Sequence, residues 1–170
     1  MTANIQLAHG DSHTKIIISM KTNNIICSGA IVYALDTKRF LFLHRVKGRS
    51  GNLWGLVGGT NEETETPWEG LKREIFEEIG EISIKKTMPL ETFVSNDTRF
   101  HFHTYLCVVD TEFMPVLNDE HDGYAWVEFG KWPRPLHHGL NNTLQNKVNL
   151  NKLETVFKVI DLIEEPPVCG

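Results

Sequence analysis

A 22-residue segment, Gly59–Gly80, constrains the fold and chemistry of this chain more than any other part of its sequence. It reads GTNEETETPWEGLKREIFEEIG. Thr66 is a favourable helix N-cap, and the proline after it has no amide hydrogen to leave unpaired at the first helical position. Glu69 completes a capping box, and the final glycine suits the left-handed position beyond a helix end. The segment therefore predicts a helix over Pro67–Ile79.

Three carboxylates share one face of this predicted helix. Because each helical residue advances by about 100°, Glu74, Glu77 and Glu78 fall within an arc of roughly 100°. Arg73 precedes Glu77 by four residues, the spacing at which the two side chains can pair. Crowded carboxylates repel one another and destabilise a helix. A hard divalent cation such as Mg²⁺ or Mn²⁺ would offset that repulsion, whereas the alternative is a solvated acidic face.

The acidity of the chain is concentrated in this region. The 170 residues carry a net charge of −5, from 17 basic and 22 acidic side chains. Eight of the acids and only two of the basic residues lie between positions 59 and 81, so the rest of the chain sums to +1. No overall basic field would attract nucleic acid or an anionic membrane. We therefore expect neither as a partner.

The composition, 41% apolar and 23% charged, is that of an ordinary globular protein. The three cysteines are far apart and odd in number, which disfavours a disulfide framework or a cysteine zinc site. The N-terminus lacks the apolar core of a signal peptide, and no apolar run approaches the roughly 18 residues that span a bilayer. We expect a cytoplasmic protein with a flexible N-terminus (1–14), a single domain (15–165) and a loose tail (166–170).

Apolar and β-branched segments on both sides of the acidic helix predict strands. They cover residues 16–20, 25–35, 39–46, 54–57, 82–86, 92–94, 100–109 and 124–128. A turn at 36–38 predicts a hairpin, and residues 118–123 form a polar loop. Two more helices are predicted over 136–145 and 150–164, the second from apolar residues at helical spacing. The acidic helix thus lies between predicted strands.

The acidic segment also fits a spaced motif, G-x5-E-x7-R-E-U-x-E-E-x-G, in which U is a bulky aliphatic residue. The matching positions are Gly59, Glu65, Arg73, Glu74, Ile75, Glu77, Glu78 and Gly80. A chance match in a chain of this length has a probability of roughly 10⁻⁷. The segment resembles the Nudix box, the signature of the Nudix hydrolases. A Trp-x-x-x-Gly-Gly lead-in and a later Tyr-x-Trp strand extend the resemblance, which implies an α/β fold: an α/β/α sandwich with a mixed central β-sheet.

The resemblance implies a role for each residue of the box. The implied ligands of Mg²⁺ or Mn²⁺ are three carboxylates and one backbone carbonyl, those of Glu74, Glu77, Glu78 and Gly59. Arg73 would orient Glu77, Glu65 would brace the preceding loop onto the helix, and Gly80 would end it. Glu74, Glu78 and Arg73 are the expected catalytic residues of the helix. The implied reaction is attack of a metal-activated water on a phosphorus of a pyrophosphate.

The general base is left open by the sequence. In the family it is either a box glutamate or a residue of a later loop, and here that loop offers Glu120 first and His121 second. The alternative is a simple polar turn. Arg45 and Arg49 lie ahead of the box and could bind phosphate oxygens. Solvated loop charges explain these two residues equally well.

Markers of the substrate are mostly absent. The resemblance favours a Mg²⁺-dependent pyrophosphohydrolase acting on a nucleoside diphosphate linked to another moiety, with ADP-ribose or a dinucleoside polyphosphate as the best guess. A nucleotide-sugar hydrolase of the GDP-mannose type is one alternative. A non-catalytic domain that senses nucleotides is another, although the complete set of box glutamates argues against it. The resemblance also suggests a homodimer.

Overall fold

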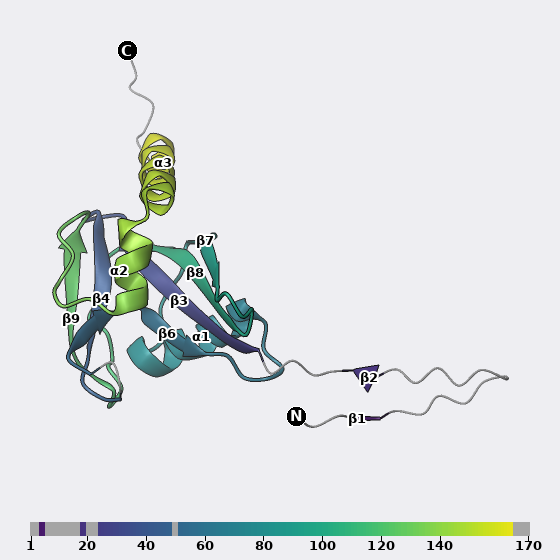
Figure 1. Cartoon of the computed structure of the whole chain (residues 1–170). Helices are drawn as coiled ribbons and strands as arrows, with labels where there is room; N and C mark the ends of the chain where they lie inside the picture. Colours follow the sequence, from purple (N-terminus) through teal and green to yellow (C-terminus); the bar gives the residue numbers. More distant parts are fainter. Residues whose placement is uncertain (1–3, 6–17, 20–23, 49–50, 165–170) are drawn as a thin grey trace, which may run out of the picture.

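The computed structural model of the chain describes residues 4–5, 18–19, 24–48 and 51–164 (Figure 1). In chain order the strands and helices are β1 (Asn4–Ile5), β2 (Ile18–Ser19), β3 (Ile25–Ala34), β4 (Arg39–Arg45), β5 (Leu53–Gly55), β6 (Val57–Thr60), α1 (Pro67–Ile79), β7 (Lys86–Val94), β8 (Phe100–Val109), β9 (His121–Glu128), α2 (His138–Gln145) and α3 (Lys147–Glu164). The predicted hairpin at 36–38 is confirmed, since it joins β3 to β4.

A mixed sheet of seven strands forms the centre of the described fold. Its main order is β5-β4-β3-β8-β7, with β6 also paired to β3 and β9 to β4. β3 and β8 run parallel over their full length, whereas the other pairs of this sheet are antiparallel. β1 and β2 form a separate antiparallel pair. The expected mixed sheet is confirmed.

Side chains alternate along the strands, so both faces of this sheet carry apolar residues, and helices cover both faces. Ile31 and Tyr33 of β3 pack into an apolar cluster with residues of α2 and α3, and α2 crosses in front of the sheet in Figure 1. Ala30 and Val32 pack into a second cluster with Leu71 and other residues of α1. Each face of the sheet thus has its own core, and the expected α/β/α sandwich is confirmed.

The acidic helix α1 begins and ends where the sequence predicts. Thr66 caps its N-terminus, and its side chain and that of Glu69 form both hydrogen bonds of the capping box. Gly80 follows the helix with φ of 83°, a value that favours glycine. Leu71, Ile75 and Ile79 are buried on the side that faces the sheet. The carboxylates of the box lie along one edge of this buried stripe.

Several predicted strand boundaries are wrong. Residues 82–84 are not a strand, and β7 instead runs from Lys86 to Val94 through Pro89. Proline is tolerated there because β7 is an edge strand, and its register with β8 shifts between Pro89 and Glu91. The segment 54–57 is divided between β5 and β6. His121 belongs to β9 and not to the preceding loop.

Some predictions fall outside the described residues. They include the tail 166–170, Arg49 and nearly all of the segment 1–14. Of the strand predicted over 16–20, Ile18–Ser19 is described and pairs with β1. Among the helices of the described part of the chain, none has the length and apolar character needed to cross a membrane.

Candidate active site

Two glycines of β6 bring the sheet next to the acidic helix. Gly58 pairs with Gly29 of β3, and a Cβ at Gly58 would lie only 2.1 Å from the backbone oxygen of Ser28. A Cβ at Gly59 would lie 2.6 Å from the carboxylate of Glu74. Real Cβ atoms do not approach other atoms this closely. The absence of side chains at both positions is what lets the carboxylate of Glu74 lie directly against the strand.

Arg73 links the loop before α1 to the carboxylates of the helix. Its guanidinium donates hydrogen bonds to Glu65 Oε1 at 2.9 Å, Glu74 Oε1 at 2.9 Å, Glu77 Oε2 at 3.1 Å and the backbone oxygen of Thr60 at 3.0 Å. The hydrogen bonds to Glu65 are the main cause of the raised pKa of Arg73, and they lower the pKa of Glu65 in turn. Five-donor geometry of this kind is specific to arginine. Arg73 therefore fixes the loop and two box carboxylates at once.

Glu78 is a buried carboxyl group beside the paired glycines. Its Oε2 atom accepts a hydrogen bond from the backbone amide of Gly58 at 2.8 Å. The pKa of Glu78 is raised to about 8, mainly by burial and also by the nearby Glu74, while the hydrogen bond from Gly58 opposes the rise. The pKa of Glu74 is also raised, mainly by burial. Two carboxyl groups are thus held together where the charged form of each is disfavoured.

His121 approaches Glu78 from β9. Its Nε2 atom lies 3.8 Å from Glu78 Oε1. Its Nδ1 atom lies 2.9 Å from Asn118 Oδ1, which also accepts the backbone N–H of Glu120 at 3.1 Å. Because Asn118 presents an oxygen, Nδ1 of His121 must carry the hydrogen, and Nε2 of the neutral ring is an acceptor. Burial lowers the pKa of His121 and so favours this neutral form.

Arg45, Glu120 and Glu77 are more exposed than Glu78 and His121. Arg45 and Glu120 pair with each other, and their side chains are 35% and 41% exposed. Glu77 is 51% exposed and is bound to Arg73. Arg49 lies outside the described residues. Of the predicted set, Glu74, Glu78, Gly59 and His121 are therefore the residues that gather in the interior.

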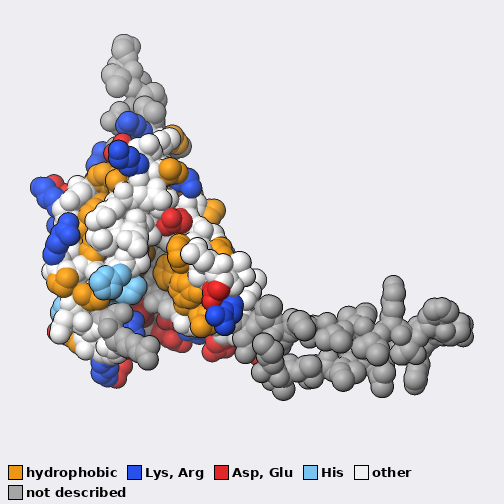
Figure 2. Space-filling view, viewed as in Figure 1, with side chains coloured by type: hydrophobic (Ala, Val, Ile, Leu, Met, Phe, Trp, Pro, Cys, Tyr) orange, Lys and Arg blue, Asp and Glu red, His pale blue; other side chains and the backbone are white. Residues whose placement is uncertain are grey.

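A cavity of about 630 Å³ opens beside these groups. Gly58, Gly59, Arg45 and His121 line one end of it. The remaining lining comes from β3, β5, β6, β7, β8, α2 and residues next to them. It includes apolar, aromatic and polar side chains, among them Cys27, Leu56, Glu91, Phe93, Phe100, Phe102, Thr104, His137, Leu140, Asn142 and Thr143. Figure 2 shows hydrophobic side chains gathered between α2 and the edge formed by β7 and β8, with acidic side chains below them. The cavity thus runs from the paired glycines, which lie against the carboxyl groups of the acidic helix, to an aromatic end.

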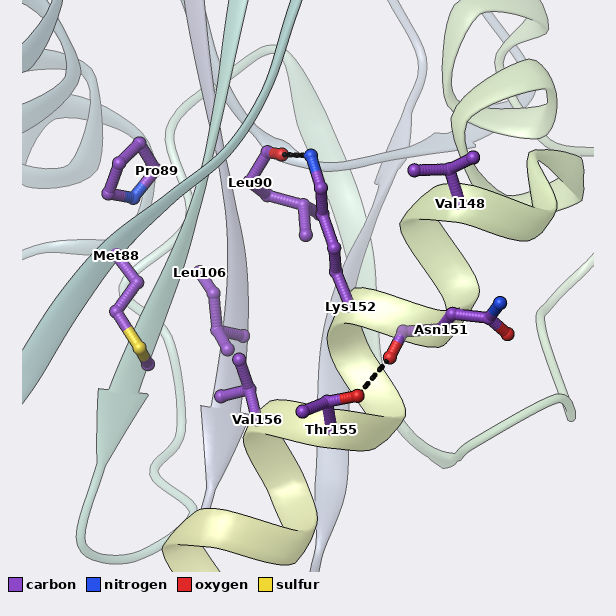
Figure 3. Close-up of a pocket in the computed structure, with 9 residues that line it drawn as sticks. All are labelled: Met88, Pro89, Leu90, Leu106, Val148, Asn151, Lys152, Thr155 and Val156. Carbon is purple, nitrogen blue, oxygen red and sulfur yellow. Dashed lines mark hydrogen bonds between the residues drawn. The ribbon is translucent and has the colours of Figure 1, made fainter.

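A second cavity, of about 660 Å³, lies between β7 and α3 (Figure 3). Met88, Leu106 and Val156 line it, and Lys152 reaches across to donate a hydrogen bond to the backbone oxygen of Leu90 at 3.0 Å. No acidic side chain is among its lining residues in the described part of the chain. The first cavity, which reaches Gly58, Gly59 and His121, is therefore the candidate active site.

The donors beside the paired glycines suit a hard divalent cation. They are carboxylate and carbonyl oxygens, the ligands that Mg²⁺ and Mn²⁺ prefer. The close approach of Glu74 to Gly59 leaves no room for a side chain at position 59. This is expected where the carbonyl of a strand residue and a carboxylate bind the same cation. Among residues 24–48 and 51–164, however, no three His, Cys, Asp or Glu side chains are grouped closely enough to hold a metal ion. Glu77 in particular is bound to Arg73.

Sequence reasoning missed the aromatic end of the cavity. Glu91 and Thr143, which hydrogen-bond each other, are separated by 52 positions and lie on a strand and a helix. No local pattern connects such residues. Alternation on β8 does place Phe100 and Phe102 on one face, and that signal was available in the sequence. Asn118, which orients His121, carries no local signal beyond its place in a polar loop.

Comparison with known proteins identifies the family. A family model described as NUDIX domain matches residues 26–146. Dihydroneopterin triphosphate diphosphatase of Haemophilus influenzae is 30% identical over 132 residues, which cover 68% of this chain and 80% of that protein.

Solved structures share the fold. A Nudix hydrolase of M. Smegmatis superposes with a TM-score of 0.63 at 20% identity, over 76% of this chain and 85% of its own. A bifunctional NMN adenylyltransferase/ADP ribose pyrophosphatase of Francisella tularensis, solved with AMP and a Mn ion, gives a TM-score of 0.50 at 25% identity, over 64% of this chain and 35% of its own. The family model spans most of the chain, and the chain accordingly belongs to the Nudix family and is a Nudix hydrolase.

Proposed function

We propose that this Nudix hydrolase cleaves a phosphoanhydride bond in a triphosphate whose aromatic ring occupies the cavity, with dihydroneopterin triphosphate as the first candidate substrate. One observation carries the proposal: a single cavity leads from Gly58 and Gly59, against which the carboxyl groups of Glu78 and Glu74 lie, to the aromatic side chains of β7 and β8. A divalent cation held by the carboxyl groups would bind the phosphates, and a planar ring suits the aromatic end.

The acidic end would bind a divalent cation through Glu74, Glu77, Glu78 and the carbonyl of Gly59. The raised pKa values of Glu74 and Glu78 support this, because carboxyl groups that burial and mutual repulsion push toward the neutral form gain most from a cation. When bound, the cation would acidify the attacking water and neutralise charge on the departing phosphate.

The reaction is a hydrolysis with one bond formed and one broken. The oxygen of water bonds to the α-phosphorus, and the bond from that phosphorus to the oxygen that bridges it to the β-phosphorus breaks. The products are a monophosphate and diphosphate. The proton of the water passes to a base of the protein. His121 is the better candidate, because its Nε2 is an acceptor and lies 3.8 Å from Glu78 Oε1, whereas Glu120 is exposed and paired with Arg45.

Two similar proteins have names that state an activity on a phosphoanhydride. Dihydroneopterin triphosphate diphosphatase, at 30% identity over 132 residues, supports a pterin triphosphate. The Francisella structure supports ADP-ribose as a second candidate, on 64% of this chain. Both substrates join an aromatic ring to a phosphoanhydride, which is what the cavity can hold.

The test is product analysis with the purified full-length chain. The protein is incubated with Mg²⁺ or Mn²⁺ and dihydroneopterin triphosphate, ADP-ribose, a dinucleoside polyphosphate, GDP-mannose or nucleoside triphosphates, and the products are separated by chromatography. Release of diphosphate and dihydroneopterin monophosphate is the expected result. Exclusive turnover of ADP-ribose would replace the first candidate by the second. Absence of turnover on all substrates would overturn the proposal.

The matched controls are two glutamine variants. Glu78→Gln removes a proposed metal ligand and should abolish turnover. Glu154→Gln makes the same chemical change on the exposed face of α3 and should leave turnover as in the wild type.

A further inference from the structure

One carboxylate of the cavity is far from the acidic helix and has no part in hydrolysis. Glu91 of β7 lines the aromatic end, where its Oε2 atom accepts a hydrogen bond from Thr143 Oγ1 of α2 at 2.9 Å. Among the described residues Thr143 is the only hydrogen-bond partner of this carboxylate, so Oε1 is left without one. A carboxylate fixed on one side and open on the other is able to bind a ligand.

The sheet sets where this carboxylate lies relative to the hydrolytic end. Gly58 of β6 pairs with Gly29 of β3, Gly29 with Thr104 of β8, and Thr104 with Glu91 of β7. These register partners cross the sheet in one row, and all of them line the cavity. Neighbouring strands are about 4.8 Å apart, so Glu91 is roughly 14 Å from Gly58. A ring, a short linker and a phosphate fit that separation.

Phenylalanine side chains stand beside this row. Phe93 of β7 pairs in register with Phe102 of β8, and Phe100 lies two residues before Phe102 on the same face. The ring centroids of Phe93 and Phe100 are 6.3 Å apart, and Phe93 is 52% exposed. Aromatic side chains of this kind bind the face of a planar ring and leave its edge to be read by polar groups.

We infer that Glu91 reads the edge of the substrate ring and selects rings with two adjacent N–H donors, which is the edge of a 2-amino-4-oxo ring such as guanine or a pterin. This rests on the proposed function and names the ring class of the same substrate. A carboxylate only accepts hydrogen bonds, and its two oxygens match two parallel donors. Oε2 has a second lone pair besides the one used by Thr143.

The same chemistry rejects other rings. Adenine presents one amino donor next to a ring nitrogen with a lone pair, and that lone pair would face the carboxylate. Hypoxanthine has the ring N–H but lacks the amino group. A site built for two donors discriminates against a ring that leaves one acceptor unpaired. The pterin of the Haemophilus relative's substrate belongs to the accepted class.

The test compares triphosphates that differ only at the ring edge. The full-length protein with Mg²⁺ is assayed for kcat/KM on dihydroneopterin triphosphate, GTP, ITP and ATP. GTP and ITP differ by a single amino group. We expect the wild type to prefer GTP to ITP by about 10- to 100-fold, because ITP leaves one carboxylate oxygen without its donor. We expect Glu91→Gln, whose amide offers a donor where an acceptor is needed, to bring the ratio close to one.

Three further proteins separate the interpretations. Glu154→Gln, a matched change on an exposed helix face, should keep the wild-type ratio. Glu91→Asp keeps both acceptors and should retain part of the preference. Thr143→Val removes the hydroxyl that orients Glu91 and should lower the ratio without removing the carboxylate. An unchanged ratio in Glu91→Gln, or equal use of GTP and ITP by the wild type, would overturn the inference.

A binding measurement distinguishes failure of this inference from failure of the proposed function. Neopterin, which has the ring and no phosphate, is titrated by its fluorescence into the wild type and into Glu91→Gln. Weaker binding by the variant supports the inference even if no triphosphate is hydrolysed, in which case the proposed function alone fails. Hydrolysis of dihydroneopterin triphosphate with equal neopterin binding by both proteins would leave the proposed function standing and refute the role of Glu91.

Discussion

The Nε2 atom of His121 lies 3.8 Å from Oε1 of Glu78, and the two side chains are only 3% and 4% exposed. They come from β9 and α1, which the sequence separates by more than forty residues. Asn118 holds the hydrogen on Nδ1 of the imidazole, so the nitrogen that faces Glu78 is the one able to accept a proton. We therefore expect His121 to affect the rate of hydrolysis and Glu78 to affect how stability depends on pH.

Replacing His121 by asparagine should lower kcat by about 10²- to 10⁴-fold, the usual contribution of a general base. Glu120→Gln should have a smaller effect, because that carboxylate is exposed and bound to Arg45. Steady-state kinetics of both variants checks the order, with circular dichroism as the control for folding. A larger loss in Glu120→Gln would reverse the assignment of the base.

The pKa of Glu78 predicts how stability depends on pH when no metal is present. Burial raises this pKa from 4.5 to about 8, so between those values the folded state retains a proton that the unfolded state releases. Its contribution to the free energy of unfolding therefore falls as pH rises from about 4.5 to about 8, by at most about 1.4 kcal/mol per pH unit. Glu78→Gln has no such contribution.

Urea unfolding in EDTA at several pH values should show Glu78→Gln gaining stability relative to the wild type as pH increases through this window. Glu154→Gln provides the baseline for the same substitution on the surface. A constant difference between Glu78→Gln and the wild type across the window would contradict a raised pKa for Glu78.

Addition of Mg²⁺ or Mn²⁺ should stabilise the protein, because a cation that binds only the folded state shifts the unfolding equilibrium. At a hundredfold excess over Kd the gain is about 2.7 kcal/mol. Differential scanning fluorimetry with and without metal measures it as a rise in Tm, and EDTA should reverse the rise. The same titration on Glu78→Gln should give a much smaller rise, and an equal rise would place the cation elsewhere.

Gly59→Ala should reduce activity by about 10²-fold, since a Cβ 2.6 Å from the carboxylate of Glu74 displaces that side chain by the order of an ångström. Gly123→Ala is the matched control, because its nearest neighbour would be His44 Cβ at an ordinary 3.6 Å. The measurement is kcat/KM of both variants on one substrate. Full activity in Gly59→Ala would show that the approach of Glu74 to β6 is unimportant.

Arg73→Lys should destabilise the fold by about 1–3 kcal/mol, because lysine cannot form the forked hydrogen bonds to Glu65, Glu74 and Thr60 simultaneously. Activity should fall as well, since Glu74 loses its partner. Arg99→Lys, at a side chain that is 75% exposed, controls for the substitution itself. Equal midpoints of chemical denaturation for the two variants would count against the bracing role of Arg73.

The sequence predicted the acidic helix well because its signals are local. Capping chemistry fixed both ends of α1, and helical periodicity placed Glu74 and Glu78 beside the buried stripe. The α/β/α sandwich followed from the resemblance that those residues carry. Short-range rules suffice where the residues concerned are neighbours on one helix.

The aromatic end could not be predicted because it is assembled from distant strands. The prediction of two short strands in place of β7 failed at Pro89, which an edge strand accommodates. Without β7 intact, the pairing of Glu91 with Thr104 cannot be derived. The pairing of Arg45 with Glu120 likewise joins a strand to the end of a loop 75 positions later. Side chains brought together by register are not visible to local patterns.

The row of register partners from Gly58 to Glu91 has a consequence for how the enzyme would measure its substrate. Hydrogen-bonded strands cannot slide or separate without breaking the sheet, so the interval between the two ends of the cavity is as rigid as the sheet itself. The sheet would then fix the distance between the ring and the phosphorus that is attacked. When the ring binds at the aromatic end, the length of the linker decides which phosphorus of the phosphate chain reaches the carboxylates. A substrate with a longer linker would place a different phosphorus there. Product identity would thus be set by length as much as by chemistry.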